Sequence, residues 1–136
     1  MGRWRGRCLT YFREVELFEA LKAEYPDLTP LSATDRADGI THNAYLELKC
    51  RRTHYETLMI ERHKWDYLAD IRARTGARTL YISATPKGIY EWDLGAINEP
   101  EWVSKRLPTK TDFAGSEMVE KWVGFLDVRH SRLLLV

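Results

Sequence analysis

The sequence predicts a single α/β domain in which a mixed central β-sheet is flanked by helices. Its 136 residues are 44% hydrophobic and 30% charged, which suits one buried core and leaves little room for a second. In some segments the hydrophobic residues have the spacing of an amphipathic helix, and in others they alternate with polar residues as in a strand. The two kinds of segment follow one another along the chain. The length also excludes a (β/α)₈ barrel, which needs roughly 250 residues.

The first helix is expected over Thr10 to Tyr25. Thr10 can cap its start, and Pro26 stops it. One helical stripe carries the apolar residues Tyr11, Phe18, Leu21 and Tyr25. Glu14 interrupts this stripe at a position where an apolar residue is expected.

A β-meander follows the first helix. Pro30 restricts any strand in the turn-prone segment 28–34 to an edge of the sheet. Residues 44–50 then alternate strictly, which predicts a half-buried strand with Glu47 and Lys49 on the same face. A tight turn at residues 42–43 sets a hairpin register in which Asp38 lies opposite Glu47.

The remaining elements are expected to be a helix, two strands and a third helix. The second helix is predicted from about Leu58 to Thr75, with Gly76 as its stop. Residues 78–84 and 89–94 are predicted to be strands joined by a short turn. A third helix is expected within about 110–136, capped by Ser116 and carrying the apolar residues Val119, Trp122, Val123 and Leu126.

The predicted hairpin brings two carboxylates together. Directly opposed residues hold their Cβ atoms roughly 4.5–5.5 Å apart, so Asp38 and Glu47 require a compensating cation. Either Lys49 or a metal ion can supply this positive charge. Mg²⁺ is a suitable metal, because it prefers oxygen ligands such as carboxylates. A Glu-x-Lys triplet alone is usually a solvated ion pair, but Asp38 in register and Glu14 in an apolar stripe favour a metal site. Asp35 and Glu16 remain alternatives to Asp38 and Glu14.

These residues resemble the PD-(D/E)XK nuclease superfamily, whose small members include archaeal-type Holliday-junction resolvases and phage junction-resolving endonucleases. The resemblance covers roughly residues 7–94 and implies an αβββαβ core. It implies that Asp38 and Glu47 hold one or two Mg²⁺ or Mn²⁺ ions, that Lys49 assists the attacking water, and that Glu14 joins the site as a glutamate from the first helix. Ala37 stands where the motif has Pro.

Charge gives a weaker indication of the partner. The 21 Lys and Arg residues against 20 Asp and Glu residues give a net charge of +1, so no global field attracts a polyanion. Most of the cations are Arg, which suits phosphate. The residues expected to bind DNA phosphates are Arg3, Arg5, Arg7, Arg51, Arg52 and Lys64. The alternative is that these basic residues form a solvent-exposed surface that binds no partner.

The expected function is that of a metal-dependent DNA endonuclease, structure-selective on branched DNA and acting as a homodimer. Two alternatives keep the same fold: a single-strand or end-processing exonuclease, and a non-catalytic DNA-binding module. A third is an α/β interaction domain with exposed carboxylates. The two cysteines form no CxxC pair, which argues against a zinc site or a disulfide scaffold. Without an apolar segment of membrane-spanning length, the expected location is the cytoplasm, or the host cytoplasm if the protein is phage-encoded.

Overall fold

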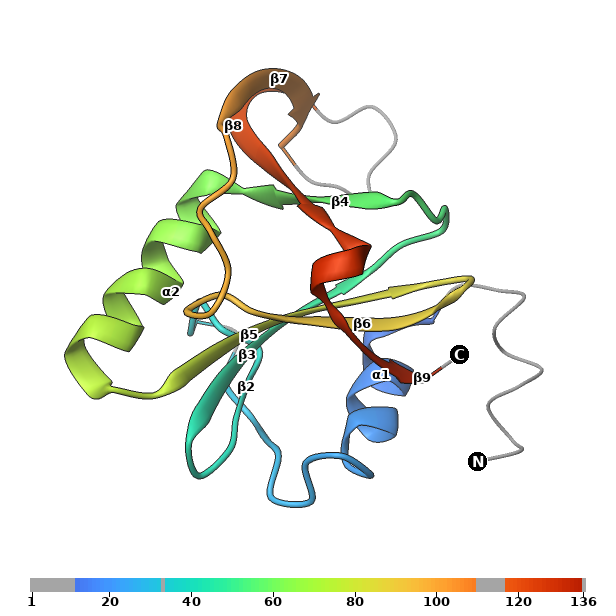
Figure 1. Ribbon diagram of the computed structural model, residues 1–136, viewed down its shortest axis with the longest axis vertical. Helices are drawn as coiled ribbons and strands as arrows, with labels where there is room; N and C mark the ends of the chain where they lie inside the picture. Colours follow the sequence, from blue (N-terminus) through green and yellow to red (C-terminus); the bar gives the residue numbers. More distant parts are fainter. Residues whose placement is uncertain (1–11, 33, 110–116, 136) are drawn as a thin grey trace.

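The computed structural model describes residues 12–32, 34–109 and 117–135, and it shows a mixed α/β protein, as the sequence predicts (Figure 1). Within these residues the helices are α1 (Glu14–Leu21), α2 (Arg62–Thr75) and the short 3₁₀-helix η2 (Val128–His130). The strands are β1 (Thr29–Pro30), β2 (Gly39–Ile40), β3 (Ala44–Cys50), β4 (Thr57–Glu61), β5 (Arg78–Thr85), β6 (Gly88–Asp93), β7 (Val103–Pro108), β8 (Met118–Asp127) and β9 (Arg132–Leu135).

The strands form two sheets. The larger sheet has the order β1-β2-β3-β5-β6-β9, in which β3 and β5 run parallel and the other neighbours run antiparallel. The smaller sheet has the antiparallel order β4-β8-β7. Helix α1 covers one face of the larger sheet, while α2 and the smaller sheet cover the other (Figure 1).

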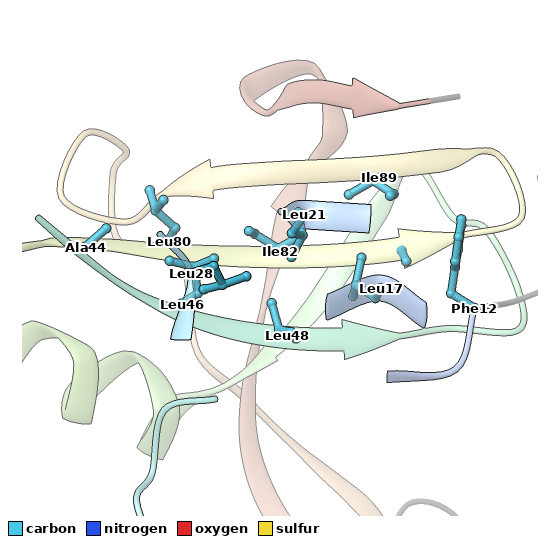
Figure 2. Packing of buried hydrophobic residues seen from close by; sticks show 11 residues of the cluster. Phe12, Leu17, Leu21, Leu28, Ala44, Leu46, Leu48, Leu80, Ile82 and Ile89 are labelled. Carbon is cyan, nitrogen blue, oxygen red and sulfur yellow. The ribbon is translucent and has the colours of Figure 1, made fainter. Parts of the chain in front are cut away.

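The core on the α1 side follows from the alternation that the sequence predicts for β3. Leu46 and Leu48 point from β3 toward α1, where Leu17 and Leu21 are also buried (Figure 2). Leu80, Ile82 and Ala84 extend this layer along β5. Burial of each large aliphatic side chain stabilises the fold by roughly 1.5–3 kcal/mol.

The core on the opposite side joins α2 to both sheets. It contains Leu58 and Ile60 from β4, with Tyr81 from β5, and is completed by Trp65, Leu68, Ile71, Trp92, Leu94 and Leu126. The central strand β5 therefore contributes to both cores, and its residues 79–85 are all buried. Because both of its faces are covered, β5 shows no alternation of buried and exposed positions, and the polar residues Thr79, Ser83 and Thr85 are buried as well.

The first helix is shorter than expected, and residues 10 and 11, where it was predicted to begin, lie outside the described residues. Helix α1 ends at Leu21, ahead of the stop expected at Pro26. The stop of α2 is confirmed, because Gly76 takes the left-handed conformation at φ 73° and its N–H donates to the Arg72 carbonyl. No helix in the described ranges has both the length and the apolar character needed to cross a membrane.

Two helical predictions are wrong. The second helix begins at Arg62, and the segment 57–61 is strand β4, in which Leu58 and Ile60 alternate with more exposed neighbours. The predicted third helix is strand β8, which pairs with β4 on one side and β7 on the other. Val119, Trp122, Val123 and Leu126 lie in this strand, and the expected cap Ser116 lies outside the described residues. Pairing on both edges outweighs the helical spacing of these β-branched and aromatic residues.

Candidate functional site

The hairpin of β2 and β3 has the predicted register. Gly39 pairs with Leu46 and Ile40 with Tyr45. The Thr41 N–H donates to the Ala44 carbonyl at 2.8 Å. The recorded pairing stops at Gly39, and Asp38 is the residue immediately before β2.

Asp38 is held in place immediately before β2 begins. Its backbone N–H donates to the Leu46 carbonyl at 2.9 Å, and its Oδ2 accepts a hydrogen bond from the Leu48 N–H at 2.8 Å. One carboxylate oxygen is thus fixed by the backbone of β3. Asp35 was the alternative to Asp38 as a metal ligand. Its Oδ2 instead accepts hydrogen bonds from the Ser32 N–H and hydroxyl, at 2.8 and 2.9 Å, and so stabilises the turn at residues 32–35.

Glu14 lies in the first turn of α1 and reaches the same place. Its carboxyl shares a side-chain hydrogen bond with Asp38, and its pKa is raised by burial and by the negative charge of Asp38. Two carboxyl groups can share a hydrogen bond when one is protonated, which agrees with the raised pKa. Glu16 is engaged elsewhere, because its Oε1 accepts from the Arg13 N–H at 3.0 Å. Of the two glutamates considered, Glu14 is the one beside Asp38.

Glu47 is the buried member of the group. Its side chain is 5% exposed, and Lys64 Nζ from α2 lies 2.5 Å from its Oε2. Burial raises the pKa of Glu47 to about 7: the Lys64 ammonium opposes this rise, while the Asp38 and Glu14 carboxylates add to it. Glu47 therefore lies within the electrostatic reach of both other carboxyls and has Lys64 as its counter-charge.

Lys49 lies on the same face of β3 as Glu47, next to Ser83 of β5 in the parallel register. Burial lowers the pKa of the Lys49 amine, and the nearby charges of Arg51 and Lys64 lower it further, against Glu61 and Glu47. An amine with a lowered pKa gives up its proton more readily and can then act as a base.

The expected DNA-binding residues have different positions. Arg51 does not face outward: its guanidinium donates to the Met59 carbonyl and, at 3.1 Å, to the Tyr81 hydroxyl. It thereby joins the end of β3 to β4 and β5, and the expected phosphate contact at Arg51 stays a prediction. Arg52 is exposed. The basic residues Arg3, Arg5 and Arg7 lie outside the described residues.

Sequence analysis missed three residues that line a cavity of about 300 Å³ beside Glu47 and Lys64. They are Arg36, His63 and Tyr67, and Leu68 completes the lining. The Arg36 guanidinium lies 5.2 Å above the centre of the Tyr67 ring. The spacing of residues 63, 64 and 67 was the available signal, because residues three and four apart share one face of a helix.

Glu14, Asp38 and Glu47 supply the carboxylate oxygens that a divalent cation prefers. Within ranges 12–32, 34–109 and 117–135, however, no three His, Cys, Asp or Glu side chains are arranged so that they could hold a metal ion. The donor chemistry fits a hard divalent cation, because Glu14 and Asp38 are in contact and both raise the pKa of Glu47. For Glu47 to bind a metal ion together with Glu14 and Asp38, its carboxylate has to separate from the Lys64 ammonium.

Comparison with protein-family models, with curated proteins and with solved structures gives no match to this chain. The site is therefore defined by its own residues: the carboxyls of Glu14 on α1, Asp38 before β2 and Glu47 on β3, with Lys49 and Lys64 beside them.

Proposed function

We propose that the protein is a Mg²⁺- or Mn²⁺-dependent endonuclease that hydrolyses phosphodiester bonds in branched DNA such as four-way junctions. The observation that carries the proposal is the electrostatic proximity of Glu14, Asp38 and Glu47, although they come from α1, the residue before β2 and the middle of β3. The negative charge of Asp38 raises the pKa of both glutamates, so the charged cluster destabilises the fold, and this cost is offset when a divalent cation binds.

In the proposed reaction the three carboxyls hold the metal, which when bound polarises a phosphodiester and lowers the pKa of water. Lys49, with its lowered pKa, accepts a proton from the attacking water. The water oxygen forms a new bond to phosphorus, the bond from phosphorus to the leaving oxygen breaks, and that oxygen takes up a proton from solvent. Asp38 is oriented for its role by the Leu48 N–H.

The preference for branched DNA and the homodimer are the parts of the proposal that rest on the resemblance to small junction-resolving nucleases. A twofold symmetric dimer presents two equal sites and can cut two paired strands together. The preference for branched DNA is open to the same test as the chemistry, because the substrate panel separates branched from unbranched DNA.

The test is an incubation of the protein with a labelled four-way junction, a duplex and a single strand, in Mg²⁺ and in EDTA. We expect cleavage of the junction in Mg²⁺ alone, and a loss of about 100-fold or more for Asp38→Ala and Lys49→Ala. Glu19→Gln is the matched control, because Glu19 also lies on α1 but pairs with Lys22 at 2.9 Å.

Three outcomes contradict parts of the proposal. The absence of metal-dependent cleavage of every substrate refutes nuclease activity. Cleavage of the single strand alone favours the exonuclease, and junction binding without cleavage favours the non-catalytic module. An equal loss of activity in Glu19→Gln refutes the assignment of the site.

A further inference from the structure

The charge pattern of α2 is unfavourable at the end beside Glu47. Its first turn begins with Arg62, His63 and Lys64 and contains no acid, although the N-terminus of a helix carries the positive end of the macrodipole. The last turn carries Arg72 and Arg74, where cations are stabilising. Residues that lower the stability of a helix are expected mainly at functional sites, so the cations in the first turn of α2 indicate a functional role.

Lys64 is committed to Glu47 in the structure described here. The ion pair is close, at 2.5 Å, and the Lys64 side chain is 31% exposed. Glu47 is also one of the carboxylates that the proposed function assigns to the metal. The ammonium and a divalent cation repel each other at a single carboxylate. A metal ion on Glu47 therefore releases Lys64.

The released ammonium lies beside the cavity of about 300 Å³ that Lys64 and Glu47 line. Arg36 and His63 also line this cavity, so three of its side chains are cationic or can become so. Tyr67 supplies an aromatic wall with the Arg36 guanidinium stacked on it. Its volume lies at the lower end of the range for small-ligand pockets, roughly 300–1,000 Å³. Cations around a partly enclosed hollow favour an anion with several acceptor oxygens.

We infer that this cavity binds a phosphate group of the nucleic-acid strand and that Glu47 controls it. Without metal, Glu47 holds Lys64; with metal, Lys64 joins Arg36 and His63 on the phosphate. The inference rests on the proposed function, because it takes the metal at Glu47 as given. The bound metal then increases the affinity for DNA. By thermodynamic linkage, bound DNA increases the affinity for the metal by the same factor.

Fluorescence anisotropy of a labelled four-way junction tests this inference without any cleavage step. In EDTA, Glu47→Gln is expected to bind about tenfold more tightly than the unmodified protein, because the neutral amide releases Lys64 as a metal does. The double variant Glu47→Gln/Lys64→Met loses this gain. Asp38→Asn is the matched control, since it removes an equal charge from the same site but leaves Lys64 on Glu47.

The coupling can also be measured with Glu47 intact. Ca²⁺ in place of EDTA is expected to tighten binding by the unmodified protein about tenfold, and Lys64→Met removes most of this gain. Single strands with and without a 5′-phosphate distinguish the source of the phosphate. A gain confined to the phosphorylated strand assigns the cavity to a strand end, and an equal gain assigns it to the internal backbone.

The outcomes separate this inference from the proposed function. A gain in Glu47→Gln that is no larger than in Asp38→Asn, or that persists without Lys64, overturns the control by Glu47. If the protein cleaves the junction but shows either result, the nuclease proposal stands and this inference alone fails. If it neither cleaves nor binds DNA in any condition, the proposed function itself fails.

Discussion

Asp38→Asn is expected to stabilise the metal-free protein, although it removes a proposed metal ligand. The pKa of Glu47 rises from 4.5 to about 7, so its ionisation costs the fold about 3 kcal/mol relative to the unfolded chain. Burial is the largest cause of this rise, and the negative charge of Asp38 adds a smaller part. Asn keeps an oxygen that can accept from the Leu48 N–H, so the hydrogen bond at 2.8 Å can survive.

The pH dependence of this effect follows from the sign of the shift. A carboxyl whose pKa is raised by folding contributes stability below its unfolded pKa of 4.5, and this contribution is lost as pH rises through about 7. Repulsion between residues 38 and 47 is therefore full at pH 8 and absent at pH 4. The gain in unfolding free energy from Asp38→Asn is expected to be about 1 kcal/mol at pH 8 and to shrink toward zero at pH 4.

Urea denaturation in EDTA at both pH values measures this gain directly. Comparison of the variant with the unmodified protein at each pH cancels the titration of other groups. Addition of Mg²⁺ at pH 8 is expected to reverse the order, because the unmodified protein retains all three carboxyls. A loss of stability in Asp38→Asn that is equal at both pH values refutes the reasoning, since it means that the carboxylates do not repel one another.

Three further changes probe other parts of the molecule. Lys49→Ala is expected to abolish cleavage yet keep the rise in Tm that Mg²⁺ gives the unmodified protein, and loss of that rise would assign Lys49 to metal binding instead. Arg51→Met removes the guanidinium that donates to the Met59 carbonyl and to the Tyr81 hydroxyl, although Tyr81 still donates to that carbonyl, and is expected to lower the unfolding free energy by about 2 kcal/mol, as measured in urea. Gly76→Ala places a side chain at φ 73° with open space around it, and the expected loss of about 1 kcal/mol would be contradicted by an unchanged Tm.

The sequence predicted the elements that depend on nearby residues. Strand β3 and its hairpin with β2 follow from strict alternation and a short turn, and the end of α2 follows from Gly76. The register of this hairpin also predicted that Asp38 and Glu47 are neighbours. Glu14 was found because a single acid broke an apolar stripe.

The elements that depend on distant partners were missed. Strand β4 pairs with β8, more than 50 residues further along the chain, and neither segment reveals that partner in its own spacing. For the same reason the sequence did not reveal the hydrogen bonds of Arg51, whose partners Met59 and Tyr81 lie on two other strands. Arg36 and Tyr67 meet only because the fold brings the loop before β2 against α2.

The parallel pairing of β3 with β5 has a consequence for folding. The two strands are joined by a crossover that includes β4 and α2, so β3 gains this neighbour only after residues 51–77 have been placed. Closing a long loop before its contacts form makes such pairing slow. The carboxyl cluster around Glu47, in the middle of β3, should therefore assemble late, and Mg²⁺ added during refolding should slow unfolding far more than it speeds folding.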